Sequence, residues 1–222
     1  MEKKLNLKFC NLIYSSKDKK ITYQKETLID AYNSNKDFFK IKIPFFNIKL
    51  VYSRKEFNEI WGSKTPSYVS AFAKEDNIVI FSYEVFEKET KWKKEKFKEA
   101  LIHEINHLFY QELRDEEYDP LWLSEGLATF LQHNKKKFNY KEKLILTKQD
   151  LNVKFESMTL KSYQIFTLFV EYLILEFGEK KILKLIKNLR KESLDALFQK
   201  IYNKSFDDLI KNGNKYHQTT WG

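Results

Sequence analysis

Short runs of apolar residues broken by polar turns characterise the first ninety residues of the chain. Several runs are rich in β-branched and aromatic residues, which favours strands, and Pro44 interrupts one of them. A four-residue polar stretch between the last two runs is typical of a strand, a turn and a second strand. The runs predicted as strands are residues 7–14, 41–52, 68–73 and 78–82.

Two helices are predicted among these strands. Residues 24–39 have apolar positions at helical spacing. Ser53 is a suitable N-terminal cap for a shorter helix, which Gly62 would end. The first ninety residues therefore predict a small α/β part with a mixed sheet and an exposed edge strand.

From about residue 90 the spacing of apolar residues becomes helical and stays so. Gly178 is a suitable C-terminal stop, and Ser205 with Asp208 resembles a capping pair. The predicted helices are residues 92–113, 120–134, 159–177, 179–190, 192–202 and 205–211. The whole is an α+β chain, with a strand-rich part at 1–90 and a mainly helical part at 91–222, expected to form one compact unit.

Composition is that of a folded protein with a basic surface. Of the 222 residues, 42% are hydrophobic and 16% aromatic, which is enough for a sizeable core. The formal charge of +9 comes from 40 basic and 31 acidic residues, but the lysines are scattered and only 135–137 form a dense run. Because no basic stripe with interleaved aromatic residues is visible, we expect no nucleic-acid partner.

The sequence predicts a cytoplasmic protein without a membrane span. Cys10 is the single cysteine, so no disulfide can form within the chain. The N-terminus lacks an apolar stretch of signal length, although a leader removed earlier would leave no trace. Residues 165–177 are too short to span a bilayer and contain Glu171 and Glu176. The pattern indicates no oligomeric state.

A metal-ligating motif lies on the helix predicted at 92–113. The sequence His103-Glu104-Ile105-Asn106-His107 places two imidazoles four residues apart. On an α-helix this spacing brings both to one face, about 40° apart, so that both can reach one tetrahedral ion. Glu104 lies about 100° round the helix, where a carboxylate can meet a metal-bound water without ligating the metal.

Glu125 is the candidate third ligand. It lies in the apolar stretch 121–130, where an unpaired carboxylate would be costly and a metal ion would offset that cost. Asp119 as N-terminal cap and Pro120 as first helical residue begin this second helix. The segment after His107 is long enough for the chain to turn and bring the two helices antiparallel.

These motifs resemble those of a known enzyme family. His-Glu-x-x-His followed by Trp-Leu-x-Glu-Gly-x-Ala is similar to the gluzincin metallopeptidases, which include thermolysin and aminopeptidase N, and above all to compact bacterial peptidase-MA-like proteins. The segments around residues 70–82 and 162–189 resemble the active-site edge and the later helices of those proteins. The likeness covers residues 45–212 and leaves 1–40 unmatched.

The resemblance implies a mechanism. It implies that His103, His107 and Glu125 bind zinc and that Glu104 is the general base toward a zinc-activated water. Gluzincins stabilise the oxyanion with an additional Tyr or His, and Tyr163 is the candidate here, although a tyrosine at the wet edge of a core fits equally well. Tyr110 and Tyr118 are alternatives.

Hydrogen-bond partners of the histidine ligands are less defined. Thr129 occupies a position where thermolysin-like proteins often carry a carboxylate, and Asp115 or Asp119 is an alternative. His133 is expected at a helix end as a surface imidazole, and His217 in an exposed C-terminal tail.

The expected function is zinc-dependent hydrolysis of peptide bonds. Residues 70–74 do not match the Gly-Met-Glu-Asn motif with which aminopeptidase N-like enzymes anchor a free N-terminus. This favours an endopeptidase, or a peptidase with a narrow substrate preference, over a general aminopeptidase. The alternative is a non-catalytic zinc-binding structural or interaction protein derived from a gluzincin. Glu104 argues against this alternative, because a structural site needs no general base.

Overall fold

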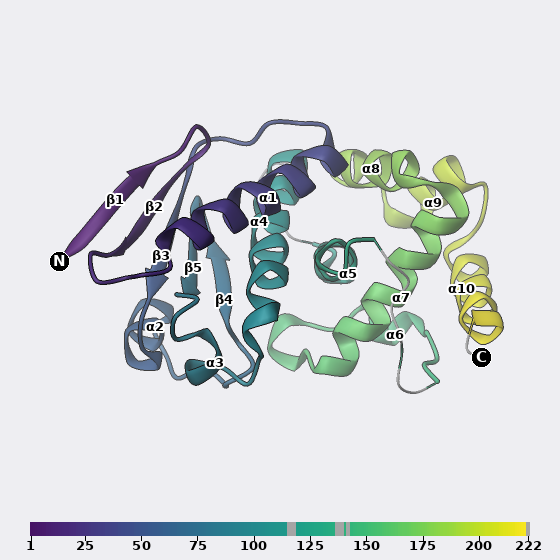
Figure 1. Cartoon of the computed structure of the whole chain (residues 1–222). Helices are drawn as coiled ribbons and strands as arrows, with labels where there is room; N and C mark the ends of the chain where they lie inside the picture. The colour runs from purple at the N-terminus through teal and green to yellow at the C-terminus, as the bar shows by residue number, and fades with distance from the viewer. Residues whose placement is uncertain (115–118, 136–139, 141–142, 221–222) are drawn as a thin grey trace. The chain divides into compact units, whose positions relative to one another are not determined.

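The chain folds into two compact units, each described by itself. The computed structural model describes residues 1–114, 119–135, 140 and 143–220. Its units are Met1–Phe109 and Tyr110–Gly222. The predicted α+β class is confirmed, since the sheet belongs to the first unit and the second is helical (Figure 1). The predicted division at residue 90 stays a prediction. No helix among the described residues has the length and apolarity needed to cross a membrane.

The sheet of the first unit has parallel strands at its centre and antiparallel strands at both edges. Its order is β1-β2-β3-β5-β4. β2 pairs with β3 and β3 with β5 in parallel, whereas β1 pairs with β2 and β4 with β5 antiparallel. The bounds are β1 Glu2–Asn6, β2 Cys10–Ser15, β3 Phe46–Val51, β4 Ala71–Lys74 and β5 Asn77–Phe81.

β1 was not predicted from the sequence. Its residues are mostly exposed and include Lys3 and Lys4, so they lack the apolar alternation of a half-buried strand. β1 is held in the sheet by its main-chain pairing with β2 over Glu2–Asn6. The interruption predicted at Pro44 is confirmed, because β3 begins only at Phe46.

Four α-helices begin in the described part of the first unit. They are α1 (Ile21–Phe39), α2 (Arg54–Trp61), α3 (Phe86–Glu89) and α4 (Phe97–Arg114), preceded by the 3₁₀ turn η1 (Lys94–Lys96). Ser53 caps α2 by accepting from the Glu56 amide at 3.2 Å, and Gly62 ends it with φ of 93°, as predicted. The predicted helix 92–113 begins later, at Phe97.

The carboxyl ends of the three parallel strands meet at Asp18. Its carboxylate accepts hydrogen bonds from Tyr52 Oη after β3 at 2.9 Å and from Ser82 Oγ after β5 at 2.7 Å. Gln24 Nε2 and the Lys20 amide donate at 2.9 and 2.8 Å. Burial raises the pKa of Asp18, but these four donors outweigh it and hold the pKa below its usual range. Asp18 thus joins the ends of three strands.

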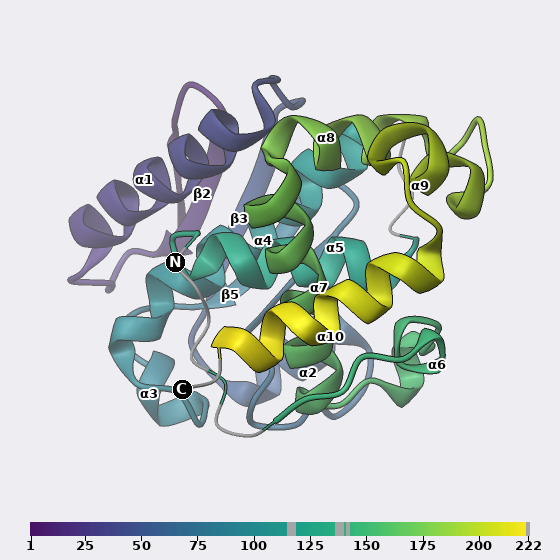
Figure 2. The same ribbon diagram turned by 90° about the vertical axis from the view of Figure 1, so that its right-hand side faces the viewer.

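The second unit is a helical assembly around aromatic residues. Trp122 lies with its ring centroid 4.9 Å from that of Phe169, and Phe198 lies 4.9 Å from Phe206. Figure 2 shows α10 passing in front of α7, and the two helices are in contact. The helices are α5 (Leu121–Gln132), α6 (Lys148–Leu151), α7 (Leu160–Phe177), α8 (Glu179–Asn188), α9 (Leu194–Tyr202) and α10 (Phe206–Thr220), with the 3₁₀ turn η2 (Phe155–Ser157).

Three predictions about helix ends can be compared with this unit. The stop at Gly178 and the pair Ser205–Asp208 are confirmed, with the Asp208 amide donating to Ser205 Oγ at 3.1 Å. The start of α5 was predicted one residue early, since Pro120 and not Asp119 is its N-terminal cap.

The expectation that His217 is exposed in a C-terminal tail was wrong. α10 extends to Thr220, and His217 is 1% exposed. Its Nε2 accepts from the Leu144 amide at 3.1 Å, and Asn214 donates to and accepts from the backbone of Leu146. These contacts with residues 144–146, more than 65 positions away, cannot be read from the tail's own polar composition.

Candidate metal centre

Helix α4 carries the two motif histidines. Leu101, Ile105 and Phe109 are at most 2% exposed and fix the buried side of the helix. His103 and His107 lie one turn apart, with ring centroids separated by 4.9 Å and ring planes at 80°. His107 is 6% exposed, whereas His103 and Glu104 are half-buried. The side-by-side imidazoles predicted from the spacing are therefore present.

A buried amide pair fixes α4 against α1. Asn106 Nδ2 donates to Asn35 Oδ1 at 3.1 Å, and Asn35 Nδ2 donates to the Ile102 carbonyl at 3.0 Å. Both asparagines are fully buried. Asn106, which lies between Ile105 and His107 in the motif, therefore faces α1. Asn35 was missed because it lies 71 positions away and belongs to no motif.

Helix α5 presents Glu125 from a tightly packed position. Glu125 is 7% exposed. A Cβ atom on the next residue, Gly126, would lie 2.5 Å from the Phe166 carbonyl oxygen and 2.8 Å from Val170 Cγ2 of α7. Such distances are far inside van der Waals contact, so the close approach of α5 and α7 requires glycine here. Gly126 thereby fixes the position of the neighbouring Glu125 relative to α7.

The segment before α5 is tied to the last turns of α4. Tyr110 Oη and Arg114 Nε, one turn apart, donate to the Asp119 carbonyl at 3.4 and 3.3 Å. Tyr110 is fully buried and Arg114 is 7% exposed. Tyr110, an alternative candidate for stabilising the oxyanion, thus has its hydroxyl on the backbone that begins α5.

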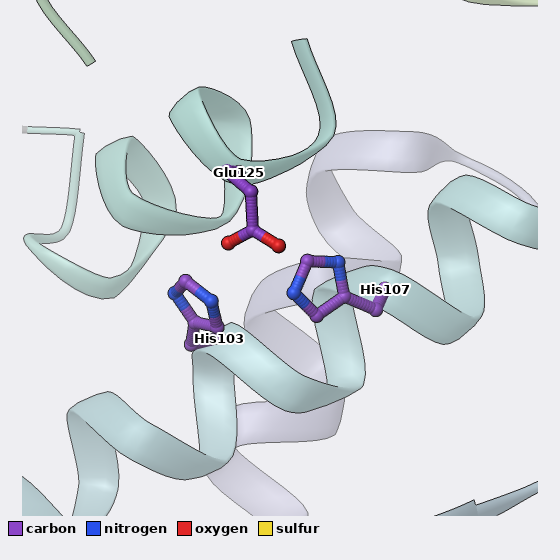
Figure 3. A group of neighbouring side chains, drawn as sticks. All are labelled: His103, His107 and Glu125. Carbon is purple, nitrogen blue, oxygen red and sulfur yellow. The ribbon is translucent and has the colours of Figure 1, made fainter. Parts of the chain in front are cut away.

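His103, His107 and Glu125 form a group that can hold a metal ion. One candidate ligand atom from each residue lies within 4.8 Å of those of the others. Figure 3 shows the carboxylate of Glu125 directed toward the two imidazole rings. Two imidazole nitrogens and one carboxylate oxygen are a donor set that suits zinc and leaves a fourth position for water or substrate. The residues present therefore fit the implied ion.

The other candidate residues have separate positions. Tyr163 is half-buried in the first turn of α7, three residues before Phe166, which contacts Gly126. Thr129 is 6% exposed on α5. Tyr118 and Asp115 lie outside the described residues, as does most of the lysine run 135–137. The roles assigned to Tyr163 and Thr129 stay predictions.

His133 lies at the end of α5, as predicted. It is the C-terminal cap of the helix and is half-buried, with Nε2 3.2 Å from Gln132 Nε2. Lys135 pairs with Glu179 at 2.7 Å.

Comparison with known proteins identifies one family. A family model described as BSP, peptidase of plants and bacteria, matches residues 51–212, a range that includes all three members of the metal-binding group. No curated protein matches the chain. The matched range nearly coincides with the stretch over which the sequence resembles metallopeptidases.

Proposed function

The chain belongs to the family of peptidases of plants and bacteria, and from this premise we propose that it is a zinc-dependent peptidase of the gluzincin type. The observation that carries the proposal is the grouping of His103, His107 and Glu125, whose ligand atoms lie within 4.8 Å of one another. Membership of a peptidase family and a group of side chains that can hold zinc both support metal-dependent hydrolysis of peptide bonds.

The residues of the site take three roles in the proposed reaction: holding the metal ion, transferring a proton and stabilising the oxyanion. His103, His107 and Glu125 would hold the ion, which when bound supplies a Lewis acid that polarises the peptide carbonyl and acidifies water. Glu104 accepts the proton of the attacking water and delivers it to the leaving amine nitrogen. Tyr163 donates a hydrogen bond to the oxygen that becomes negative in the transition state.

Glu104 is what favours an enzyme over a structural zinc site. It follows His103 directly on α4 and is half-buried. A site whose only task is to join two helices requires ligands that complete the coordination of the ion, and it requires no adjacent carboxylate. The non-catalytic alternative gives this residue no part in binding the ion.

The proposed specificity is that of an endopeptidase. The residues that precede and form β4, Ser70 to Lys74, lack the motif with which aminopeptidase N-like enzymes bind a free N-terminus. Peptides with an acetylated N-terminus should therefore be cleaved at internal bonds as fast as unblocked ones.

The test is Glu104→Gln beside the control Glu112→Gln. Both residues lie on α4, but Glu112 is exposed and outside the group. We expect Glu104→Gln to lose about 10³-fold or more in kcat/KM on acetylated and free peptides while its zinc content stays at the wild-type level. Glu112→Gln should behave as wild type. Full activity of Glu104→Gln would contradict the mechanism, and zinc binding without cleavage by the wild type would favour the structural alternative.

A further inference from the structure

A lysine held between aromatic rings lies in the loops next to the edge strand β4. Lys91 Nζ lies 4.6 Å from the ring centroid of Trp92 and 5.3 Å from that of Tyr68. Both distances fall within the range of cation–π attraction. Lys91 is exposed, and Tyr68 is 41% exposed, so the ammonium stays accessible to a ligand.

Lys91 differs from three nearby lysines that form ion pairs. Lys93 pairs with Glu87 at 3.4 Å, Lys96 with Glu99 at 2.8 Å and Lys98 with Asp30 at 2.9 Å. Over the described residues, Lys91 Nζ has no carboxylate within ion-pair distance and makes no hydrogen bond. Because aromatic faces accept no conventional hydrogen bond, its three N–H groups stay available for an anionic oxygen.

Main-chain and indole contacts fix this arrangement. Trp92 Nε1 donates to the Tyr68 carbonyl at 2.7 Å, and the Lys91 amide donates to the Ser67 carbonyl at 3.0 Å. The loops that carry the two rings are thus joined to each other. The backbone positions of the lysine and of both rings are thereby fixed relative to one another, which lowers the entropy lost on binding.

Arg54 makes hydrogen bonds to both loops, the one that carries Tyr68 and the one that carries Lys91 and Trp92. Its Nη1 donates to Thr65 Oγ1 at 3.0 Å and to the Val69 carbonyl at 2.8 Å in the loop before β4. Its Nη2 donates to the Glu89 carbonyl, and its backbone amide donates to Glu89 Oε2 at 2.7 Å. The loops that carry Tyr68, Lys91 and Trp92 are therefore joined through the half-buried guanidinium of Arg54.

Tyr68, Lys91 and Trp92 lie near the edge strand β4, with which an extended polypeptide could pair. β4 is the last strand in the sheet order, so one of its edges has no strand partner among the described strands. An extended peptide can add to such an edge through its main chain. Tyr68 precedes the first residue of β4, Ala71, by three positions, which is at most about 10 Å of extended chain.

We propose that Tyr68, Lys91 and Trp92 form a subsite for the carboxylate side chain of an extended peptide, so that the protein prefers acidic substrates. The proposal rests on the proposed peptidase function and adds a substrate class to it. Charge complementarity supports it, since the protein carries a net charge of +9. The rings of Tyr68 and Trp92 contact the aliphatic part of a Glu or Asp side chain, and Lys91 binds its carboxylate.

The test compares peptides that differ by one charge. A cleaved peptide is synthesised with Glu or with Gln at each position in turn, and kcat/KM is measured for wild type, Lys91→Met and Lys88→Met. Lys88 is a matched control, because it is exposed on α3 and no ring or carboxylate contact is known for it among the described residues. We expect one position at which Glu raises kcat/KM of the wild type by about threefold to fivefold, mainly through KM.

The variants decide the outcome. Lys91→Met should abolish the difference between the Glu and Gln peptides, and Lys88→Met should retain it. A further variant, Lys91→Glu, should reverse the difference, so that the Gln peptide is cleaved faster than the Glu peptide. An equal preference in Lys91→Met and wild type, or no preference at any position, would overturn the subsite. If no peptide is cleaved at all, the peptidase proposal fails, and binding of the same labelled peptides by fluorescence anisotropy then tests the subsite by itself.

Discussion

Two buried carboxylates of this chain have the same exposure but very different surroundings. Asp18 and Glu125 are each 7% exposed. Around Asp18, four donors from its own unit lie within 2.7–2.9 Å. Glu125 instead has two imidazole nitrogens among its neighbours, and the three candidate ligand atoms lie within 4.8 Å of one another.

The difference separates a structural carboxylate, Asp18, from the proposed metal ligand, Glu125. Hydrogen-bond donors satisfy the charge of Asp18 entirely within the protein. Imidazole nitrogens beside a carboxylate are Lewis bases that can share a cation. Burial alone therefore does not identify a functional acid. The chemical type of the surrounding atoms does. Removing the Asp18 carboxylate should lower stability and leave zinc affinity unchanged, whereas removing the Glu125 carboxylate should lower zinc affinity.

The largest expected effect on stability concerns the packing beside Glu125. Gly126→Ala places a Cβ 2.5 Å from the Phe166 carbonyl oxygen, so α5 and α7 must separate. We expect a loss of about 3 kcal/mol in the free energy of unfolding, measured by urea denaturation. Zinc affinity should fall as well, because Glu125 moves with α5.

Gly213→Ala is the matched control in α10. A Cβ there would meet Tyr172 Cδ1 at 3.4 Å, an ordinary van der Waals contact with the edge of a ring. Because alanine has a higher helix propensity by up to about 1 kcal/mol, this variant should be as stable as wild type or more stable. Equal stability of the two variants would show that the helices do not require glycine at position 126.

A smaller effect is expected from Asp18→Asn. The Lys20 amide donates to Oδ1, whereas Gln24, Tyr52 and Ser82 donate to Oδ2. An asparagine keeps only one of these two acceptor oxygens, so its NH₂ group must face a donor on the other side. We expect a loss of about 2 kcal/mol in the free energy of unfolding, with zinc affinity unchanged. The exposed Asp37→Asn on α1 is the control. A loss of zinc from Asp18→Asn would contradict the division into structural and ligand carboxylates.

The smallest expected effect is the pH dependence of the stabilisation that Asp18 gives to the folded protein. Its pKa in the folded protein lies below the usual value, so its stabilisation is fully present above the unfolded pKa, about 3.9. That stabilisation is lost as the pH falls through the folded pKa. The difference in unfolding free energy between wild type and Asp18→Asn should be constant from pH 7 to about pH 5 and shrink below about pH 4. An increase of this difference in acid would show that the sign is wrong.

Local patterns predicted well the features that depend on local spacing. The paired imidazoles follow from the period of the α-helix, and the caps at Ser53, Gly62 and Gly178 follow from residue type. Glu125 was recognisable because a carboxylate interrupts an apolar helix and because the surrounding motif resembles a known one.

Features that depend on distant partners were not predictable. β1 is held by its pairing with β2 and shows no apolar alternation of its own. The burial of His217 depends on Leu144, and the position of Asn106 depends on Asn35. A single sequence carries no signal that links residues so far apart, whereas the spacing within one helix is fixed by backbone geometry.

Zinc titration of the metal-free protein tests the central claim most directly. Wild type and Glu125→Ala are stripped with a chelator and titrated with zinc in the presence of a competing indicator. The account predicts one zinc ion per wild-type chain and an affinity at least about 100-fold weaker in Glu125→Ala. It would be contradicted if the wild type took up no zinc, or if both proteins bound it equally well.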